Sequence, residues 1–227
     1  EVLKADDPVD YWNLKRQGIE RIIDAPIYHD GKIIGYLGAD NYEKSDMINT
    51  VAILETVSYF ISSKITNHRL MVELEHASRH DALTGLHNRN ACMEKIDFLT
   101  KYSSSVGIVY ADVNGLKEIN DTLGHQAGDA ALRQAARLLT KCYGLENTYR
   151  IGGDEFLVIF PRIEKQALLL KLRYIQNAVS HAVVDDYPDI KLSISIGGVF
   201  RITPLMEAIR QADQFMYQDK ARKGILR

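Results

Sequence analysis

The segment RIGGDEFLVIF, from Arg150 to Phe160, constrains the fold more than any other part of this sequence. Thr148 and Tyr149 precede it and FLVIF ends it, so both flanks have the β-branched and aromatic residues typical of strands. Between the flanks stand two glycines and two acids, which interrupt the strand pattern. The segment therefore predicts a β-hairpin whose turn carries two adjacent carboxylates. A turn accounts for the glycines, but it does not account for the acids.

Strand and helix patterns alternate on both sides of this hairpin. Short strands are expected over 106–113 and 190–200. Helices are expected in the second half of 120–142, over 167–183 and over 204–223. An α/β sandwich with helices on one face of the sheet is the simplest architecture for this order of elements.

The N-terminal part has a different pattern. Residues 1 to about 45 contain two short strand patterns around a turn at His29, Asp30 and Gly31, which are too few strands for a stable sheet of their own. Residues 47–79 contain neither proline nor glycine and predict one long helix.

Positions along this helix alternate in steps of four and three: Ile53, Val57, Phe60, Lys64, Asn67, Met71 and Leu74. We call these seven residues the seam. Two interpretations fit them. The seam is the contact surface of a coiled coil, with Asn67 setting the register, or it is the apolar side of an amphipathic helix that packs on its own domain.

Composition excludes some classes of protein. The formal net charge of −2 leaves no basic footprint for nucleic acid, and no apolar run approaches the ~18 residues of a spanning helix. The chain begins at Glu1 without a signal-like segment, so we expect a fragment of a longer protein that meets a membrane only through an upstream segment. Cys92 and Cys142 have no motif spacing, which favours reduced thiols and a cytoplasmic location.

The two predicted strands that carry acids suggest a site. Asp112 ends the strand 106–113, and Asp154 lies at the hairpin turn, so the two carboxylates meet at one sheet edge if these strands are neighbours. Hard oxygen ligands of this kind, completed by the Val113 carbonyl, suit Mg²⁺ or Mn²⁺ bound together with phosphates. Gly152 and Gly153 would let a flat ligand lie directly on the backbone.

Five motifs in order carry a resemblance to a known family. They are DALTGLHNR (81–89), YADVNGLKEINDTLGHQAGD (110–129), RIGGDEF, SISIGGV (193–199) and ADQFMYQDK (212–220). From His80 to Lys223 the sequence resembles the GGDEF family of diguanylate cyclases. The resemblance implies an α/β fold of the α+β kind, a βαββαβ sandwich like the palm of adenylyl cyclases and polymerases.

The resemblance also implies an activity. Two GTP molecules are condensed into cyclic di-GMP with release of two pyrophosphates, and two divalent ions, Mg²⁺ or Mn²⁺, serve each active site. Each domain holds one GTP, so a homodimer is required for catalysis.

Site residues follow from the same resemblance, motif by motif. The implied metal contacts are Asp112, the Val113 carbonyl, Asp154 and Glu155. The implied catalytic residues are Asp154 (also a general base), Glu155 and Lys117. The implied substrate contacts are Asn120 and Asp129 on guanine, Lys117 and Lys220 on phosphates, the backbone of Asn114, Gly115 and Leu116 on the triphosphate, and bare backbone at Gly152 and Gly153. Taken singly, the lysines are also consistent with solvated helix charges and Asn120 with a helix N-cap.

Five positions depart from the family pattern or have a structural interpretation. Gly224 stands where an arginine is usual after Lys220, with Arg222 or Lys223 as possible replacements. Tyr143 and Glu146 replace an Arg-x-x-Asp inhibition site, which predicts no product inhibition there. Asp81 and Arg89 are interpreted as structural ion-pairing residues.

The N-terminal zone resembles the last part of a GAF sensor domain, with a PAS-like sensor as the competing interpretation. The expected organisation is a partial sensor over 1–49, a connecting signalling helix over 50–79 and the cyclase domain over 80–227, with a sensor ligand that the residues do not identify. An alternative function is a catalytically silent domain that binds GTP or a protein as a receptor. A third is a cyclase making a different or mixed dinucleotide, against which Asp129 argues because it disfavours adenine.

Overall fold

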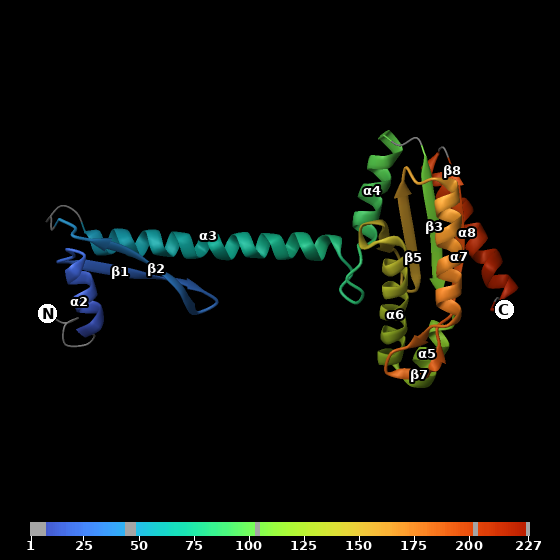
Figure 1. The fold of residues 1–227 in the computed structure, drawn as a ribbon, viewed down its shortest axis with the longest axis horizontal. Coiled ribbons are helices and arrows are strands. Elements are labelled where there is room, and N and C mark those ends of the chain that lie inside the picture. Colours follow the sequence, from blue (N-terminus) through green and yellow to red (C-terminus); the bar gives the residue numbers. More distant parts are fainter. Residues whose placement is uncertain (1–7, 44–48, 103–104, 202–203, 226–227) are drawn as a thin grey trace. The chain divides into compact units, whose positions relative to one another are not determined.

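The computed structural model describes residues 8–43, 49–102, 105–201 and 204–225. The chain divides into two compact units, Glu1–Leu74 and Glu75–Arg227 (Figure 1). None of the helices in the described part of the chain has the length and apolarity that crossing a bilayer requires.

The first unit consists of a helix, a hairpin and most of a long helix. Its elements are α2 (Pro8–Arg16), β1 (Ile22–His29), β2 (Lys32–Asp40) and α3 (Thr50–Arg79). β1 and β2 are antiparallel, and Asp30 and Gly31 turn between them with φ of 49° and 72°. The predicted strand pair is therefore confirmed.

The long helix predicted over 47–79 is observed as α3, while residues 47 and 48 lie outside the described residues. Asn49 caps its start, because its Oδ1 accepts from the Ala52 N–H at 3.1 Å. The helix begins where this cap is available.

One side of α3 holds the β1–β2 hairpin. The Ser58 hydroxyl donates to the Pro26 carbonyl, and Ser62 Oγ accepts from the Tyr28 N–H at 3.0 Å. Further along the same side, Arg69 contacts His29 at 2.6 Å. Helical periodicity puts the seam on the opposite side, where its five apolar members are 40–71% exposed. The helix thus packs on its own unit, but not through the seam.

The second unit carries the signature hairpin. Its elements are α4 (Arg89–Tyr102), β3 (Val106–Val113), α5 (Leu116–Leu123), α6 (His125–Tyr143), η1 (Leu145–Asn147), β4 (Thr148–Arg150), β5 (Glu155–Pro161), α7 (Lys165–Ser180), β6 (Val183–Val184), β7 (Tyr187–Lys191), β8 (Ile194–Arg201) and α8 (Leu205–Arg222). The main sheet has the order β4-β5-β3-β8 with every pair antiparallel, and β6 and β7 form a separate hairpin.

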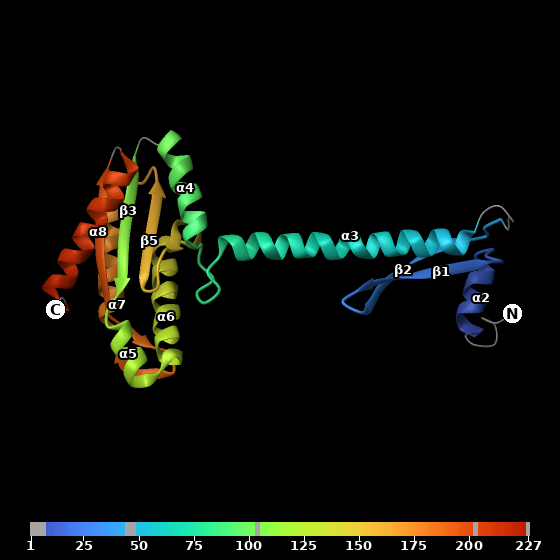
Figure 2. The same cartoon turned by 180° about the vertical axis from the view of Figure 1, so that it is seen from behind.

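Helices cover both faces of the main sheet, so the expectation of helices on one face was wrong. Residues of α6 and α7 pack with Val109, Ala111 and Val113 of β3. Residues of α4 and α8 pack with Val106 and Ile108 on the other face. Figures 1 and 2 show the unit from opposite sides. Two covered faces explain why β3 is apolar almost throughout instead of alternating.

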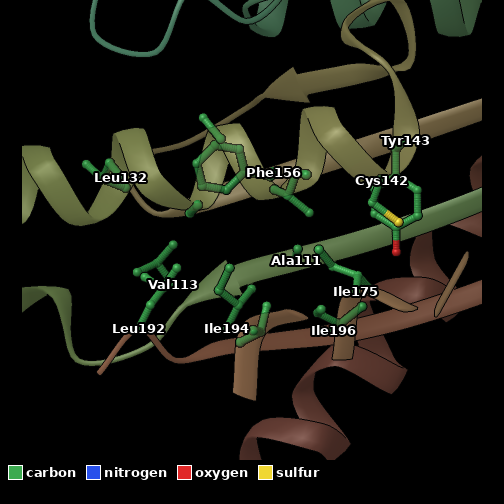
Figure 3. Close-up of a cluster of buried hydrophobic side chains, with 14 of the residues drawn as sticks. Ala111, Val113, Leu132, Cys142, Tyr143, Phe156, Ile175, Leu192, Ile194 and Ile196 are labelled. Atoms are coloured by element: carbon green, nitrogen blue, oxygen red, sulfur yellow. The ribbon is translucent and has the colours of Figure 1, made fainter. Parts of the chain in front are cut away.

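The larger core lies between α6, α7 and the sheet (Figure 3). Ala111 and Val113 of β3, Phe156 of β5 and Ile175 of α7 are each at most 1% exposed. This core fixes the ends of β3 and β5, which carry the predicted metal ligands.

The helix predicted in the second half of 120–142 is confirmed, because it lies within α6. A separate helix, α5, precedes it across Gly124, which has a φ of 84°. The strand predicted over 190–200 is interrupted, because Leu192 and Ser193 leave the β7 pairing before β8 begins at Ile194. Local periodicity could not locate this break, since it depends on which neighbours the chain meets.

Gly197 of β8 lies directly against α8, and we expect Gly197→Ala to destabilise the unit by about 3 kcal/mol. An added Cβ would stand 2.1 Å from the Ala212 carbonyl oxygen and 2.2 Å from the Met216 nitrogen, and these backbone atoms cannot rotate away. Urea unfolding measures the change. Gly153→Ala is the control, because a Cβ at Gly153 meets nothing within 4 Å. Equal unfolding midpoints for the two variants would contradict the close β8–α8 contact.

Candidate active site

The acids of β3 and β5 lie on neighbouring strands. Asp112 is the Cα partner of Glu155, and the Val113 N–H donates to the Asp154 carbonyl at 2.9 Å. Cross-strand partners point to the same face of a sheet, and this face is the one covered by α8. The predicted convergence of the two acid-bearing segments at one sheet edge is therefore observed.

Lys220 of α8 pairs with the first of these acids. Its Nζ lies 2.7 Å from Asp112 Oδ1, and the two side chains are 23% and 9% exposed. Burial raises the pKa of Asp112, the Lys220 hydrogen bond lowers it, and the charges of Asp154 and Glu155 raise it again, so that the net shift is upward. Lys220 is therefore not a solvated helix charge. It partly neutralises a crowded, half-buried group of acids.

Glu155 is oriented from two sides. The Tyr110 hydroxyl donates to its Oε1 at 3.2 Å, and its Oε2 would lie 2.5 Å from a Cβ at position 152. Gly152 therefore leaves the space that the Glu155 carboxylate occupies. Burial and the adjacent Glu155 raise the pKa of Tyr110, so this phenol remains a donor at neutral pH.

The signature glycines are not explained by turn geometry. Neither Gly152 nor Gly153 has a positive φ, so the hairpin does not need glycine for its backbone conformation. Gly153 is exposed, and a Cβ there would meet no atom of the described chain within 4 Å. Nothing in the fold requires a glycine at position 153, which is consistent with the predicted approach of a ligand to the bare backbone.

Arg150 fixes the signature loop to the start of the domain. Its guanidinium donates to the Gly153 carbonyl at 2.7 Å and to Asp81 Oδ1 at 2.9 Å. Asp81 also accepts from the Thr84 hydroxyl at 2.6 Å. Asp81 is thus a structural ion-pairing residue, but pairing it with Arg89 was wrong. Spacing within one motif could not reveal a partner 69 residues away.

The polar groups of Asn114 are hydrogen-bonded to Ser195 of β8 and to Ser193, which directly precedes β8. Its N–H donates to the Ser193 carbonyl, its Nδ2 donates to Ser193 Oγ, and its Oδ1 accepts from Ser195 Oγ, at 2.9, 2.9 and 3.0 Å. The Asn114 N–H is therefore not available to a triphosphate, which corrects that part of the prediction. Gly115, with a φ of 71°, and Leu116 remain as the expected donors at the start of α5.

The predicted guanine contacts lie on adjacent helices. Asn120 belongs to α5 and Asp129 to α6, and both are partly exposed. Within the described chain neither side chain has a hydrogen-bond partner. Asn120 lies inside its helix, so the alternative of an N-cap was wrong. Lys117 is exposed near the start of α5.

The C-terminal corner contains a further lysine with a structural role. Lys223 Nζ donates to the Ile194 carbonyl and to Asp219 Oδ2, both at 2.7 Å. Asp219 in turn accepts from the Ile196 N–H at 3.0 Å. These bonds hold α8 on β8, so Lys223 does not replace the missing arginine.

The acids are suitable in kind for a hard divalent cation. Asp112, Asp154 and Glu155 supply only carboxylate oxygens, and the raised pKa of Asp112 reflects both burial and repulsion that a cation would relieve. In residues 8–43, 49–102, 105–201 and 204–225, no three metal-ligating side chains already converge on one point.

A scan against protein families matches residues 78–224 to the model described as "Diguanylate cyclase, GGDEF domain". The chain belongs to the GGDEF family. The match contains the acids, Lys220, Asn120 and Asp129, and it begins after the end of the first unit at Leu74.

Curated relatives agree with this assignment. The chain is 30% identical to diguanylate cyclase DgcM of Escherichia coli over 67% of its own length, and 29% identical to diguanylate cyclase DgcP of the same species over 96%. It is 31% identical over 80% of its length to cyclic di-GMP phosphodiesterase PdeB of Shewanella oneidensis. The chain spans only 21% of PdeB and 38% of DgcM, against 71% of DgcP.

Solved structures share the fold. The coiled coil and GGDEF domain of DgcB from Caulobacter crescentus, in complex with c-di-GMP, has a TM-score of 0.64 at 23% identity, covering 75% of this chain and 95% of that one. Diguanylate cyclase SiaD from Pseudomonas aeruginosa, in complex with its activator SiaC, has a TM-score of 0.59 at 28% identity, covering 76% and 70%. The α/β GGDEF fold predicted from the motifs is confirmed.

Sequence reasoning missed Arg150, Tyr110 and the two serines that hold Asn114. Arg150 directly precedes the signature, and a cation beside a glycine-rich loop is a detectable signal. Tyr110 lies two residues before Asp112 on the same face of β3, which strand periodicity could have indicated.

Proposed function

We propose that this chain is a diguanylate cyclase that condenses two GTP molecules into cyclic di-GMP and releases two pyrophosphates. The observation that carries the proposal is the β3–β5 register, which sets Asp112 opposite Glu155 and beside Asp154, with the Lys220 ammonium 2.7 Å from Asp112 Oδ1. In each half-reaction a 3′-oxygen bonds to the partner's α-phosphorus as the bond from that phosphorus to pyrophosphate breaks. The 3′-hydroxyl proton leaves through Asp154.

The chain's own residues act mainly by positioning and by charge neutralisation. Asp112, the Val113 carbonyl, Asp154 and Glu155 would hold Mg²⁺ or Mn²⁺. Two such ions, when bound, lower the pKa of the attacking hydroxyl and neutralise the leaving pyrophosphate. Lys220 and Lys117 bind phosphate oxygens, and the Gly115 and Leu116 N–H groups bind the triphosphate.

The base is read between α5 and α6. Asn120 offers both a donor and an acceptor, and Asp129 accepts from the N1 and N2 hydrogens of guanine. Adenine has no matching donors at these positions. GTP is therefore the proposed substrate, and Gly152 and Gly153 leave room for it against the hairpin.

Two copies of the chain form the active enzyme through the seam of α3. The hairpin β1–β2 occupies the other side of the helix, while Phe60, Met71 and Leu74 are 60%, 71% and 70% exposed. Lys64 and Asn67 interrupt the seam, and one polar residue at such a position sets the register of a parallel pair.

Phe60→Glu is expected to weaken dimerisation at least tenfold, or about 1.4 kcal/mol, because it brings two carboxylates together in an apolar contact. Sedimentation measures the dissociation constant, and cyclic di-GMP formation should fall most at low protein concentration. Tyr59→Glu is the matched control, since Tyr59 is 77% exposed but lies outside the seam. An unchanged dimer in Phe60→Glu would contradict the seam.

The first unit regulates the second in this proposal. Residues 1–49 form the C-terminal part of a GAF-like sensor, 50–79 the signalling helix and 80–227 the cyclase domain. A rotation within the dimer would change whether two bound GTP molecules face each other. We place the protein in the cytoplasm, because its proposed substrate is GTP and its cysteines, Cys92 and Cys142, are free and buried in the two cores.

The test is direct. The purified dimer is incubated with GTP and Mg²⁺, and cyclic di-GMP and pyrophosphate are separated by chromatography. Both products are expected in a ratio of one to two. Absence of both from a proven dimer would overturn the proposal.

The second candidate is a silent domain that binds GTP without turnover. The Lys220–Asp112 pair favours it, because the Lys220 ammonium lies 2.7 Å from an Asp112 oxygen that a cation would otherwise bind. Saturable GTP binding with no pyrophosphate release would identify this function.

A further inference from the structure

Gly128 is a glycine in an unfavourable place. It is the fourth residue of α6 and is buried. Glycine in a helix interior is less favourable than alanine, because it loses more backbone freedom on folding. Its φ is not in the left-handed region, so the backbone does not require it. The reason for a glycine must lie in what packs against it.

The neighbour is Asn120. A Cβ at position 128 would lie 2.0 Å from Asn120 Oδ1 and 2.9 Å from its Cγ, and 3.2 Å from Leu116 Cδ1. Both neighbours belong to α5, so the two helices meet over the bare Cα of Gly128. The main chain of Asn120 is fixed as well, since its carbonyl accepts from the Gly124 N–H at 3.0 Å between the two helices.

The carboxamide of Asn120 therefore rests on Gly128, whose chain neighbour is Asp129. Throughout the described residues, neither the Asn120 nor the Asp129 side chain bonds to another protein group, so their polar atoms remain available to a ligand. Any side chain at position 128 would displace the Asn120 amide from this place.

We propose that Gly128 is a positioning residue for base recognition: it holds the Asn120 carboxamide beside Asp129, so that the two side chains read one guanine. The inference rests on the proposed function, because it concerns the same nucleotide site. Gly128 touches no substrate itself and acts through Asn120.

The experiment is a double-mutant cycle in the full chain, with Gly128→Ala, Asn120→Ala and the double variant. The probes are 3′-deoxy-GTP and 3′-deoxy-ATP, which lack the attacking hydroxyl and are not turned over. Gly128→Ala should weaken 3′-deoxy-GTP binding about tenfold, as expected for misplaced hydrogen bonds, and leave 3′-deoxy-ATP binding unchanged. In the Asn120→Ala background the same change should have no further effect on either probe.

Urea unfolding provides the second readout. Gly128→Ala should raise the unfolding midpoint in the Asn120→Ala background, where the two closest contacts of the added Cβ are gone and helix propensity outweighs the remaining contact with Leu116. In the native background it should lower the midpoint or leave it unchanged. Leu116→Ala serves as the control background, because it removes the other side chain of α5 that contacts position 128. In this background Gly128→Ala should still weaken 3′-deoxy-GTP binding.

The outcomes are separable. If the native chain binds neither probe, the proposed function fails, and the inference about base recognition falls with it, although the stability cycle still reports the Asn120–Gly128 contact. If the native chain binds 3′-deoxy-GTP and Gly128→Ala binds it equally well, the positioning role is wrong while the proposed function stands. The same holds if Gly128→Ala no longer weakens 3′-deoxy-GTP binding in the Leu116→Ala background.

Discussion

Asp154→Asn is expected to reduce cyclic di-GMP formation at least ~10³-fold while leaving the fold intact. The change keeps the shape of the side chain and removes its charge, so the loss would come from cation binding and proton acceptance. The fold should tolerate it, because the contact that Asp154 makes with β3 is through its carbonyl, to the Val113 N–H. Product formation at saturating GTP and Mg²⁺ measures the effect, and circular dichroism checks the fold.

Asp121→Asn is the matched control. It removes one exposed carboxylate from α5, next to Asn120, and should retain nearly full activity. Mn²⁺ binding followed by electron paramagnetic resonance gives an independent readout, in which affinity falls for Asp154→Asn only. Full activity of Asp154→Asn would show that the turn acids do not serve the reaction.

Lys220→Met is expected to have the second largest effect, and on two properties. It leaves the Asp112 carboxylate, 9% exposed, without its counter-charge, which should cost about 3 kcal/mol of unfolding free energy at pH 7. Activity should fall about 10²-fold, because the proposed contact of Lys220 with a phosphate is lost as well.

The pH dependence of this loss follows from Asp112. Its pKa already lies above its ordinary value, and removal of Lys220 raises it further. An acid with a raised folded pKa binds its proton more tightly in the native state, so protonation favours folding as the pH falls. The destabilisation by Lys220→Met should therefore be complete at pH 7 and shrink as the pH falls through the raised pKa.

Urea unfolding at pH 7 and pH 5 tests both statements. Lys141→Met, which removes an exposed lysine from the end of α6, should change the unfolding free energy at neither pH. Added Mn²⁺ should restore part of the stability of Lys220→Met, because a cation replaces the lost charge beside Asp112. A loss that is equal at both pH values would contradict the role of the Lys220–Asp112 pair.

Much of the second unit could be predicted from short segments. The strand 106–113, the hairpin around the signature and the helix over 204–223 were recognisable, because their apolar periodicity and turn residues are local signals. The long helix of the first unit was recognisable for the same reason. The helix in the second half of 120–142 was recognisable as well, but the separate helix α5 before Gly124 was not, since a single glycine does not reveal whether a helix precedes it.

In the candidate site, too, some features could be predicted from the sequence and others could not. Asp112, Asp154 and Glu155 could be named from residue types and motif order. Their partners could not, since Lys220 reaches Asp112 from 108 residues away and Arg150 reaches Asp81 from 69. For Asn114 the motif was misleading: it suggested a ligand contact, whereas in the structure the side chain is hydrogen-bonded to Ser193 and Ser195.

The sequence by itself determined the residue types of the candidate site: a carboxylate at the end of one strand, two more at a turn, and bare glycines between strands. These follow from residue identity and short-range periodicity, which are properties of the chain alone. Only the tertiary structure decided that Gly152 makes room for Glu155, that Gly128 makes room for Asn120, and that Gly197 makes room for α8. The physical reason is that a glycine shows only that a side chain is absent from the sequence. The folded structure alone shows which atoms pack into the space that the missing side chain leaves.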